Sequence, residues 1–171
     1  MTYNNDETIV AFEKCISFLN SIGIKTIFRK IEADSFLPGL LIENGVIIID
    51  RDALEHAGDI LHEAGHIAVV QPAHRNRLTA KNIIKRSNRE GEEMMAIAWS
   101  YAACVHLEID PFFVFHDQGY RGGSKDITDS CSKNDYLGLF MLQALGMTTD
   151  GKQVLSEAIP SYPHMIKWLR E

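Results

Sequence analysis

Five consecutive residues, His62-Glu63-Ala64-Gly65-His66, carry the side chains with the clearest potential for chemistry in this sequence. On an α-helix, residues four positions apart lie on the same side, one turn apart, so His62 and His66 can offer two imidazole nitrogens to one cation. Imidazole nitrogens are common ligands of zinc. The segment therefore predicts a helix that supplies two ligands to a metal ion.

Glu63 lies between the two histidines and is suited to acid–base chemistry rather than to ligation. At about 100° per residue, Glu63 points roughly 60° away from His66 and roughly 100° away from His62. Its carboxylate can then take a proton from a water molecule that the cation activates, and later pass it to a leaving amine. We expect Glu63 to be a general base, with the small Ala64 and Gly65 allowing close packing behind the site.

A third protein ligand is required, because a catalytic zinc site combines three ligands with one position for water. Acidic candidates follow the motif: Glu90, Glu92, Glu93 and Glu108. Glu93 would project from a second helix on the same side as Ile97 and Cys104, whereas Glu92 would point about 100° elsewhere. Either carboxylate could instead complement the positive end of a helix dipole. We predict Glu93 in preference to Glu92, and zinc as the metal, with manganese and iron as alternatives.

Regular elements that could position these residues are predicted on both sides of the motif. Apolar residues at helical spacing predict a helix over residues 7–21, and a β-branched segment predicts a strand over 24–31. Asn44-Gly45 joins the apolar segments 40–42 and 46–49 and predicts a type I′ hairpin, in which both central residues need positive φ. Three strands therefore precede the motif.

The motif helix is predicted to begin at a capping box formed by Asp52 and Glu55, and to end at Pro72. Residues 73–89 are expected to form a long connection with room for a short helix, and residues 112–133 to be irregular and glycine-rich. Three further helices are predicted: residues 91–107, residues 136–145 and a short helix after Pro163.

Length and composition fit one folded domain over residues 1–171, with a core at 6–107 and a C-terminal helical extension at 112–171. We expect an α+β fold in which a small three-stranded antiparallel or mixed sheet packs on a helical bundle that contains the His-Glu-x-x-His helix. The net charge of −6 argues against a general nucleic-acid binder.

Nothing in the sequence predicts secretion or a membrane span. The N-terminus lacks a basic-then-apolar pattern, and the longest largely apolar segment, 94–105, is too short to cross a bilayer. The three cysteines are odd in number, widely spaced and without a Cys-x-x-Cys pair, so neither a disulfide framework nor a thiolate zinc site is indicated. We expect a cytoplasmic protein without membrane contact and leave its oligomeric state open.

The order helix, strand, β-hairpin, His-Glu-x-x-His helix and Glu-bearing helix resembles the ImmA/IrrE-type zinc metallopeptidases, which are gluzincin-like. In that family the third ligand lies in the pattern Glu-Ala-x-x-Phe-Ala. The matching segment, Glu93-Met94-Met95-Ala96-Ile97-Ala98, keeps the glutamate and the last alanine and replaces the second and fifth positions. The resemblance covers roughly residues 6–107 and implies a zincin-like fold, a zinc cofactor, and a protein or peptide substrate such as a transcriptional regulator.

Three functions are compatible with these residues. The leading hypothesis is a zinc endopeptidase with Glu63 as general base. The second is a non-catalytic regulatory or binding module that keeps a metal site for structure, although such a site has no need of Glu63. The third is a metal-dependent hydrolase of a non-peptide amide, because the same activation of water serves several carbonyl substrates.

Other residues have both a functional and a structural interpretation. Asp59 could orient a ligand imidazole, but we favour a solvated side chain. Tyr101, His116 and Tyr120 are candidates for stabilising an oxyanion, and for each of them a structural role is the more common one. The basic segment 75–89 could recruit an acidic partner or nucleic acid, but a solvated loop is the simpler interpretation.

Overall fold

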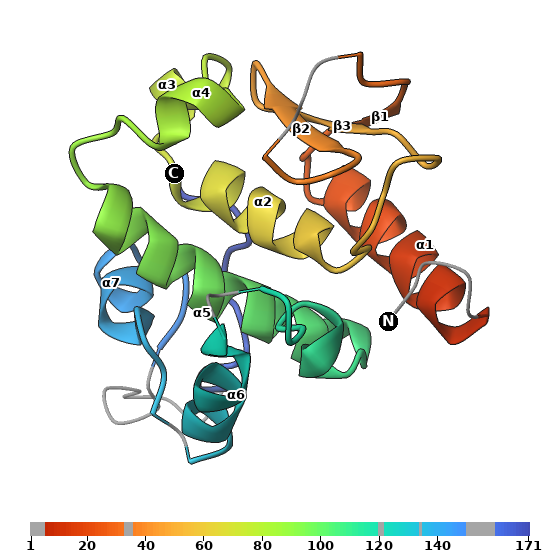
Figure 1. Ribbon diagram of the computed structural model, residues 1–171. Helices are drawn as coiled ribbons and strands as arrows, with labels where there is room; N and C mark the ends of the chain where they lie inside the picture. Colours follow the sequence, from red (N-terminus) through yellow and green to blue (C-terminus); the bar gives the residue numbers. More distant parts are fainter. Residues whose placement is uncertain (1–5, 33–35, 120–121, 134, 150–159) are drawn as a thin grey trace.

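The computed structural model describes residues 6–32, 36–119, 122–133, 135–149 and 160–171. It has an α+β fold with a small sheet and several helices. Figure 1 shows α2 (Asp59–Val69) in the middle of the molecule, with the sheet and α1 (Asp6–Ser21) on one side and α5 (Arg89–Leu107) crossing it on the other. The predicted motif helix is therefore central to the fold.

The sheet is mixed and has three strands in the order β1-β3-β2, so that β3 is central. β3 pairs in parallel with β1 and antiparallel with β2. Asn44 and Gly45 connect β2 to β3 with φ values of 54° and 73°, which confirms the predicted hairpin. β1, at three residues, is shorter than predicted. The strands are β1 (Thr26–Phe28), β2 (Leu40–Glu43) and β3 (Val46–Ile49).

The predicted start of the motif helix at Asp52 is wrong, because α2 begins seven residues later, at Asp59. The cause is a competing local turn. The carboxylate of Asp50, directly after β3, accepts hydrogen bonds from the backbone N–H groups of Asp52 at 3.2 Å and Ile31 at 2.9 Å. The chain between β3 and α2 therefore forms turns, and Leu54, directly after the first of them, is buried without being part of a helix.

The helices over residues 7–21 and 91–107 are confirmed, with small shifts at their N-terminal ends. The connection after α2 holds two short helices, and the segment 112–133, predicted to be irregular, contains a helix of nine residues. The remaining helical elements are α3 (Pro72–Arg75), α4 (Ala80–Ile83), η1 (Pro111–Phe113), α6 (Ser124–Ser132) and α7 (Leu139–Ala144).

The predicted helix after Pro163 is wrong, because residues 160–171 contain no helix. Their backbone groups bond to other elements instead. The N–H of Ile166 donates to the Met147 carbonyl at 2.8 Å, and that of Arg170 donates to the Ala68 carbonyl in the last turn of α2 at 2.9 Å. The C-terminal segment thereby satisfies a carbonyl that a helix end leaves unpaired.

Apolar side chains from α1, the sheet, α2, α5 and the C-terminal segment form one buried cluster. The fully buried Trp99 of α5 packs against Trp168 and Phe18, which joins α1, α5 and the C-terminus. Cys15 and Cys104 are free and buried, and burial raises the pKa of the Cys15 thiol to about 12. Among the described residues, no helix combines the length and the apolar character of a membrane span.

Candidate metal centre

The close crossing of α2 and α5 depends on small residues behind the motif. A Cβ at Gly65 would lie 2.9 Å from the carbonyl oxygen of Ala96 and 3.1 Å from its Cβ, so glycine lets the two helices approach. The hydroxyl of Ser100 donates to the Ala96 carbonyl at 2.6 Å and lies 3.3 Å from that of Leu61, on α2. This contact brings the motif histidines within reach of the first turns of α5.

His62, His66 and Glu93, which we call the metal cluster, converge on one point. The two Nε2 atoms are 3.1 Å apart, and the rings are nearly perpendicular at 88°. The carboxylate oxygens of Glu93 lie 3.5 Å from His62 Nε2 and 3.3 Å from His66 Nε2. Ligands around tetrahedral zinc are separated by about 3.3–3.4 Å, given bond lengths of about 2.0–2.1 Å. The donor atoms therefore suit zinc in both type and spacing.

The neighbouring Glu63 belongs to the same group of side chains. Its carboxylate and the two imidazoles offer ligand-type atoms that all lie within 4.8 Å of one another, and this His-Glu-His group could hold a metal ion. Glu93 adds a carboxylate from a second helix, and its side chain is 43% exposed. The cluster is thus open to solvent on the side of α5.

Burial and mutual charge polarise the side chains of the cluster. Burial lowers the pKa of His62 to about 4, with the charge of His66 acting in the same direction and Glu93 opposing it. Burial also lowers the pKa of His66, but a hydrogen bond to Glu93 and the charge of Glu63 outweigh it, so the pKa is raised. For Glu93, burial acts upward, and the hydrogen bond to His66 with both histidine charges lowers the pKa on balance. A bound cation would favour neutral imidazoles and an ionised carboxylate.

Glu63 titrates unlike an ordinary glutamate. Burial raises its pKa to about 7, the charge of His66 opposes the shift, and the charges of Asp59 and Glu93 add to it. A carboxyl group with a pKa near neutrality exchanges a proton readily in both directions, which is what general acid–base chemistry needs. The environment of Glu63 is therefore compatible with the role predicted for it.

The two adjacent glutamates at the start of α5 have different partners. Glu92 is 6% exposed, and both of its carboxylate oxygens accept hydrogen bonds from Arg86, at 2.6 and 2.8 Å. Glu93 faces the histidines instead, because successive helical residues point about 100° apart. The structure thus places Glu93, and not Glu92, at the metal cluster.

The preferred interpretation of Asp59 as a solvated residue is wrong. Asp59 is only 9% exposed, and its Oδ1 lies 2.9 Å from Nε2 of His116. The ring of His116 in turn stacks on that of His56, with centroids 3.8 Å apart and an interplanar angle of 12°. His56 Nε2 lies 3.2 Å from the amide oxygen of Gln118. We call His56 and His116 the stacked pair.

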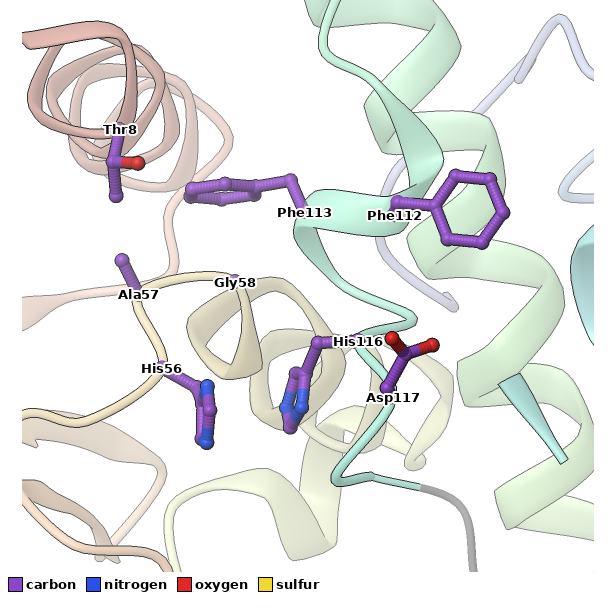
Figure 2. Close-up of a pocket in the computed structure, with 8 residues that line it drawn as sticks. All are labelled: Thr8, His56, Ala57, Gly58, Phe112, Phe113, His116 and Asp117. Atoms are coloured by element: carbon purple, nitrogen blue, oxygen red, sulfur yellow. The ribbon is translucent and has the colours of Figure 1, made fainter. Parts of the chain in front are cut away.

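A cavity of about 270 Å³ adjoins the stacked pair rather than the metal cluster. Figure 2 shows the two imidazole rings face to face on one side of it, while the ring of Phe113 points toward Thr8 on the other. The pairing of His116 with Asp59 leaves no signal in the sequence, because the two residues are 57 positions apart. The cavity is lined by Thr8, His56, Ala57, Gly58, Phe112, Phe113, His116 and Asp117.

The other candidates for oxyanion stabilisation are placed differently. Tyr101 is eight residues along α5 from Glu93, or about 12 Å at 1.5 Å per residue. Its ring packs with those of Tyr136 and Tyr162, at centroid distances of 5.7 and 6.4 Å. His116 is bonded to Asp59, as described above, and Tyr120 lies outside the described residues.

Comparison with known proteins does not identify a family or a function for this chain. No protein-family model matches this chain, no curated protein matches it, and no solved structure matches its fold. The geometry and chemistry of the metal cluster are therefore the main indication of function.

Proposed function

We propose that this chain is a zinc-dependent endopeptidase in which Glu63 is the general base. The observation that carries the proposal is the convergence of three donor groups, with Nε2 atoms 3.1 Å apart and the Glu93 carboxylate 3.3–3.5 Å from both. Three protein ligands and an open fourth position are the arrangement of catalytic rather than structural zinc. When bound, zinc polarises the scissile carbonyl and makes a water molecule acidic.

The side chains of the site have two different roles, metal binding and proton transfer. His62, His66 and Glu93 would hold the cation, and the two helices fix the positions of these side chains through the crossing at Gly65. Glu63 removes a proton from the attacking water as the new C–O bond forms. It then returns that proton to the amine nitrogen as the C–N bond breaks, so the carboxylate is regenerated. Without a cation the pKa of Glu63 is about 7, because of burial. A cation bound beside it would lower that pKa and favour the ionised form that accepts the proton.

A peptide substrate is favoured over other carbonyl compounds by the order of the elements. The β-hairpin, the motif helix and the Glu-bearing helix follow one another as in the ImmA/IrrE-type metallopeptidases that the sequence resembles. A purely structural metal site is disfavoured, because it would not require a partly buried carboxyl group with a raised pKa beside the ligands.

The test is the substitution Glu63→Gln, which keeps the size of the side chain and removes its basicity. We expect the variant to retain the zinc of the wild type by elemental analysis and to lose roughly 10²–10⁴-fold in hydrolysis, the usual contribution of general acid–base catalysis. Hydrolysis is measured by mass spectrometry on a diverse peptide library and a panel of small amides.

Glu55→Gln provides the matched control, because Glu55 is exposed in the turn before α2. This variant should cleave at the wild-type rate. Wild-type activity in Glu63→Gln would overturn the mechanism. Cleavage of small amides without cleavage of any peptide would overturn the peptidase proposal but keep the chemistry.

A further inference from the structure

The segment that joins α2 to α5 is basic in an otherwise acidic chain. Residues 64–89 contain no aspartate or glutamate, although the chain carries a net charge of −6. The segment includes α3 and α4, which lie together at one end of the molecule in Figure 1. Its six basic residues are Arg75, Arg77, Lys81, Lys85, Arg86 and Arg89.

Two of these six residues anchor the segment. Arg75 donates to two carbonyl oxygens at the C-terminal end of α2, both at 3.2 Å, and to the carbonyl of Arg170 at 2.8 Å. Arg86 holds the carboxylate of Glu92 in the first turn of α5. The segment is thus fastened at both ends, although most of its side chains are exposed to solvent.

The part between the anchors is also held by packing and hydrogen bonds. Leu78 is 1% exposed and belongs to the core. The side chain of Thr79 accepts a hydrogen bond from the N–H of Asn82, and the Asn82 side chain accepts one from the N–H of Thr79, which forms a capping box for α4. Asn82 also donates to the carbonyl of Arg77 at 2.7 Å. These contacts hold the backbone that presents the basic side chains.

The other four basic residues, Arg77, Lys81, Lys85 and Arg89, are exposed, and we call them the basic surface. None of them forms an ion pair with a described carboxylate. Ile84, among them in the sequence, is 58% exposed and adds an apolar contact. Among the six basic residues, only the two anchors, Arg75 and Arg86, bond to other described parts of the protein through their side chains, and the remaining basic side chains point to solvent.

The basic surface ends beside the metal cluster. Arg89 is the first residue of α5, four residues before Glu93, which is about one helical turn. Its positive charge is among the influences that lower the pKa of Glu93. An extended peptide advances about 3.3–3.6 Å per residue, so acidic residues a few positions from a bond held at the cluster would reach this surface.

We propose that the basic surface docks an acidic segment of the protein substrate beside the scissile bond. The substrate part of this inference rests on the peptidase function proposed above. A polypeptide is favoured over nucleic acid, because residues 75–89 contain no Phe, Tyr or Trp on which bases could stack. The exposed Ile84 also suits an apolar residue of a peptide.

The experiment measures binding without cleavage, on the full chain carrying Glu63→Gln. The probe is a short fluorescent peptide of glutamate and leucine, compared with its glutamine version and with single- and double-stranded DNA oligonucleotides. We expect fluorescence anisotropy to show binding of the glutamate peptide only, weakening with added salt. Adding Lys81→Glu and Lys85→Glu should weaken that binding by about tenfold or more, because both charges become repulsive.

Lys125→Glu with Lys133→Glu is the matched control, since it makes the same change in net charge within α6 and directly after it, at the other end of the molecule in Figure 1. It should leave binding unchanged, with both double variants checked for folding by circular dichroism. Equal losses in the two variants, absence of binding, or tighter binding of DNA than of the acidic peptide would each overturn the docking proposal. Binding that persists in a chain whose wild type cleaves no peptide would overturn the proposed function alone.

Discussion

The metal cluster and the stacked pair each place two histidines beside a carboxylate, yet their geometries differ. The carboxylate is the half-buried Glu93 in the first and the buried Asp59 in the second. In the metal cluster the rings are nearly perpendicular, and their Nε2 atoms face each other across 3.1 Å. In the stacked pair the rings lie 12° from parallel, and each Nε2 has its own side-chain oxygen, at 3.2 and 2.9 Å.

We infer that the direction of the lone pairs, and not the number of histidines, decides whether two imidazoles could hold a metal ion. Two facing imidazole nitrogens repel each other unless a proton or a cation lies between them, and the nearby carboxylate adds to the demand for positive charge. In the stacked pair a neutral imidazole can donate to each oxygen, so those nitrogens need no cation. We therefore expect only the first arrangement to bind zinc.

The largest expected contrast is between His66→Ala and His116→Ala. Loss of His66 removes a predicted ligand and should weaken zinc binding by more than about 100-fold. Loss of a residue that only hydrogen-bonds to a ligand weakens metal binding by up to about 100-fold. Loss of His116 should leave zinc affinity unchanged. Both values come from competition titrations against a chromophoric chelator, with circular dichroism confirming that each variant is folded. Equal weakening in the two variants would remove the distinction between the two histidine arrangements.

A sharper contrast separates the adjacent glutamates. Glu93→Gln should lower the zinc content, because a neutral amide is a poorer ligand than a carboxylate. Glu92→Gln should keep the zinc and lower the free energy of unfolding by roughly 1–3 kcal/mol, since Arg86 loses a charged acceptor. Elemental analysis and urea unfolding measure the two effects. Retention of zinc by Glu93→Gln, with loss by Glu92→Gln, would reverse the predicted ligand.

These contrasts also show what the sequence could predict. The motif histidines, the Asn44-Gly45 hairpin and the position of Glu93 depend on local periodicity or on helix geometry, and the structure places all of them as predicted. The ligand roles of His62, His66 and Glu93 stay predictions until zinc is measured. The predicted start of α2 is wrong because two local patterns compete. The sequence allows a capping box at Asp52 and Glu55, but the carboxylate of Asp50 stabilises a turn there.

The stacked pair could not be predicted from the sequence, for a different reason. It forms because η1 packs against the N-terminal end of α2, where a Cβ at Gly58 would overlap the carbonyl of Phe113. That contact joins positions far apart in the chain and leaves no periodic signal. The anchors of the basic segment were equally beyond a sequence-based prediction, because the Arg170 carbonyl and the Glu92 carboxylate are brought to it by tertiary packing.

The smallest expected effect comes from Asp59→Asn, which removes the charge beneath the stacked pair and keeps the shape. Burial raises the pKa of Asp59, while the hydrogen bond and charge of His116 act against that shift. An asparagine oxygen can still accept from His116, so we expect urea unfolding to show a loss of about 1 kcal/mol or less. Zinc content should not change. Asp52→Asn, in the exposed turn before α2, is the control for loss of a negative charge. If Asp59→Asn lost zinc while Asp52→Asn kept it, Asp59 would be a supporting part of the metal centre, and the two histidine arrangements would form one site rather than two.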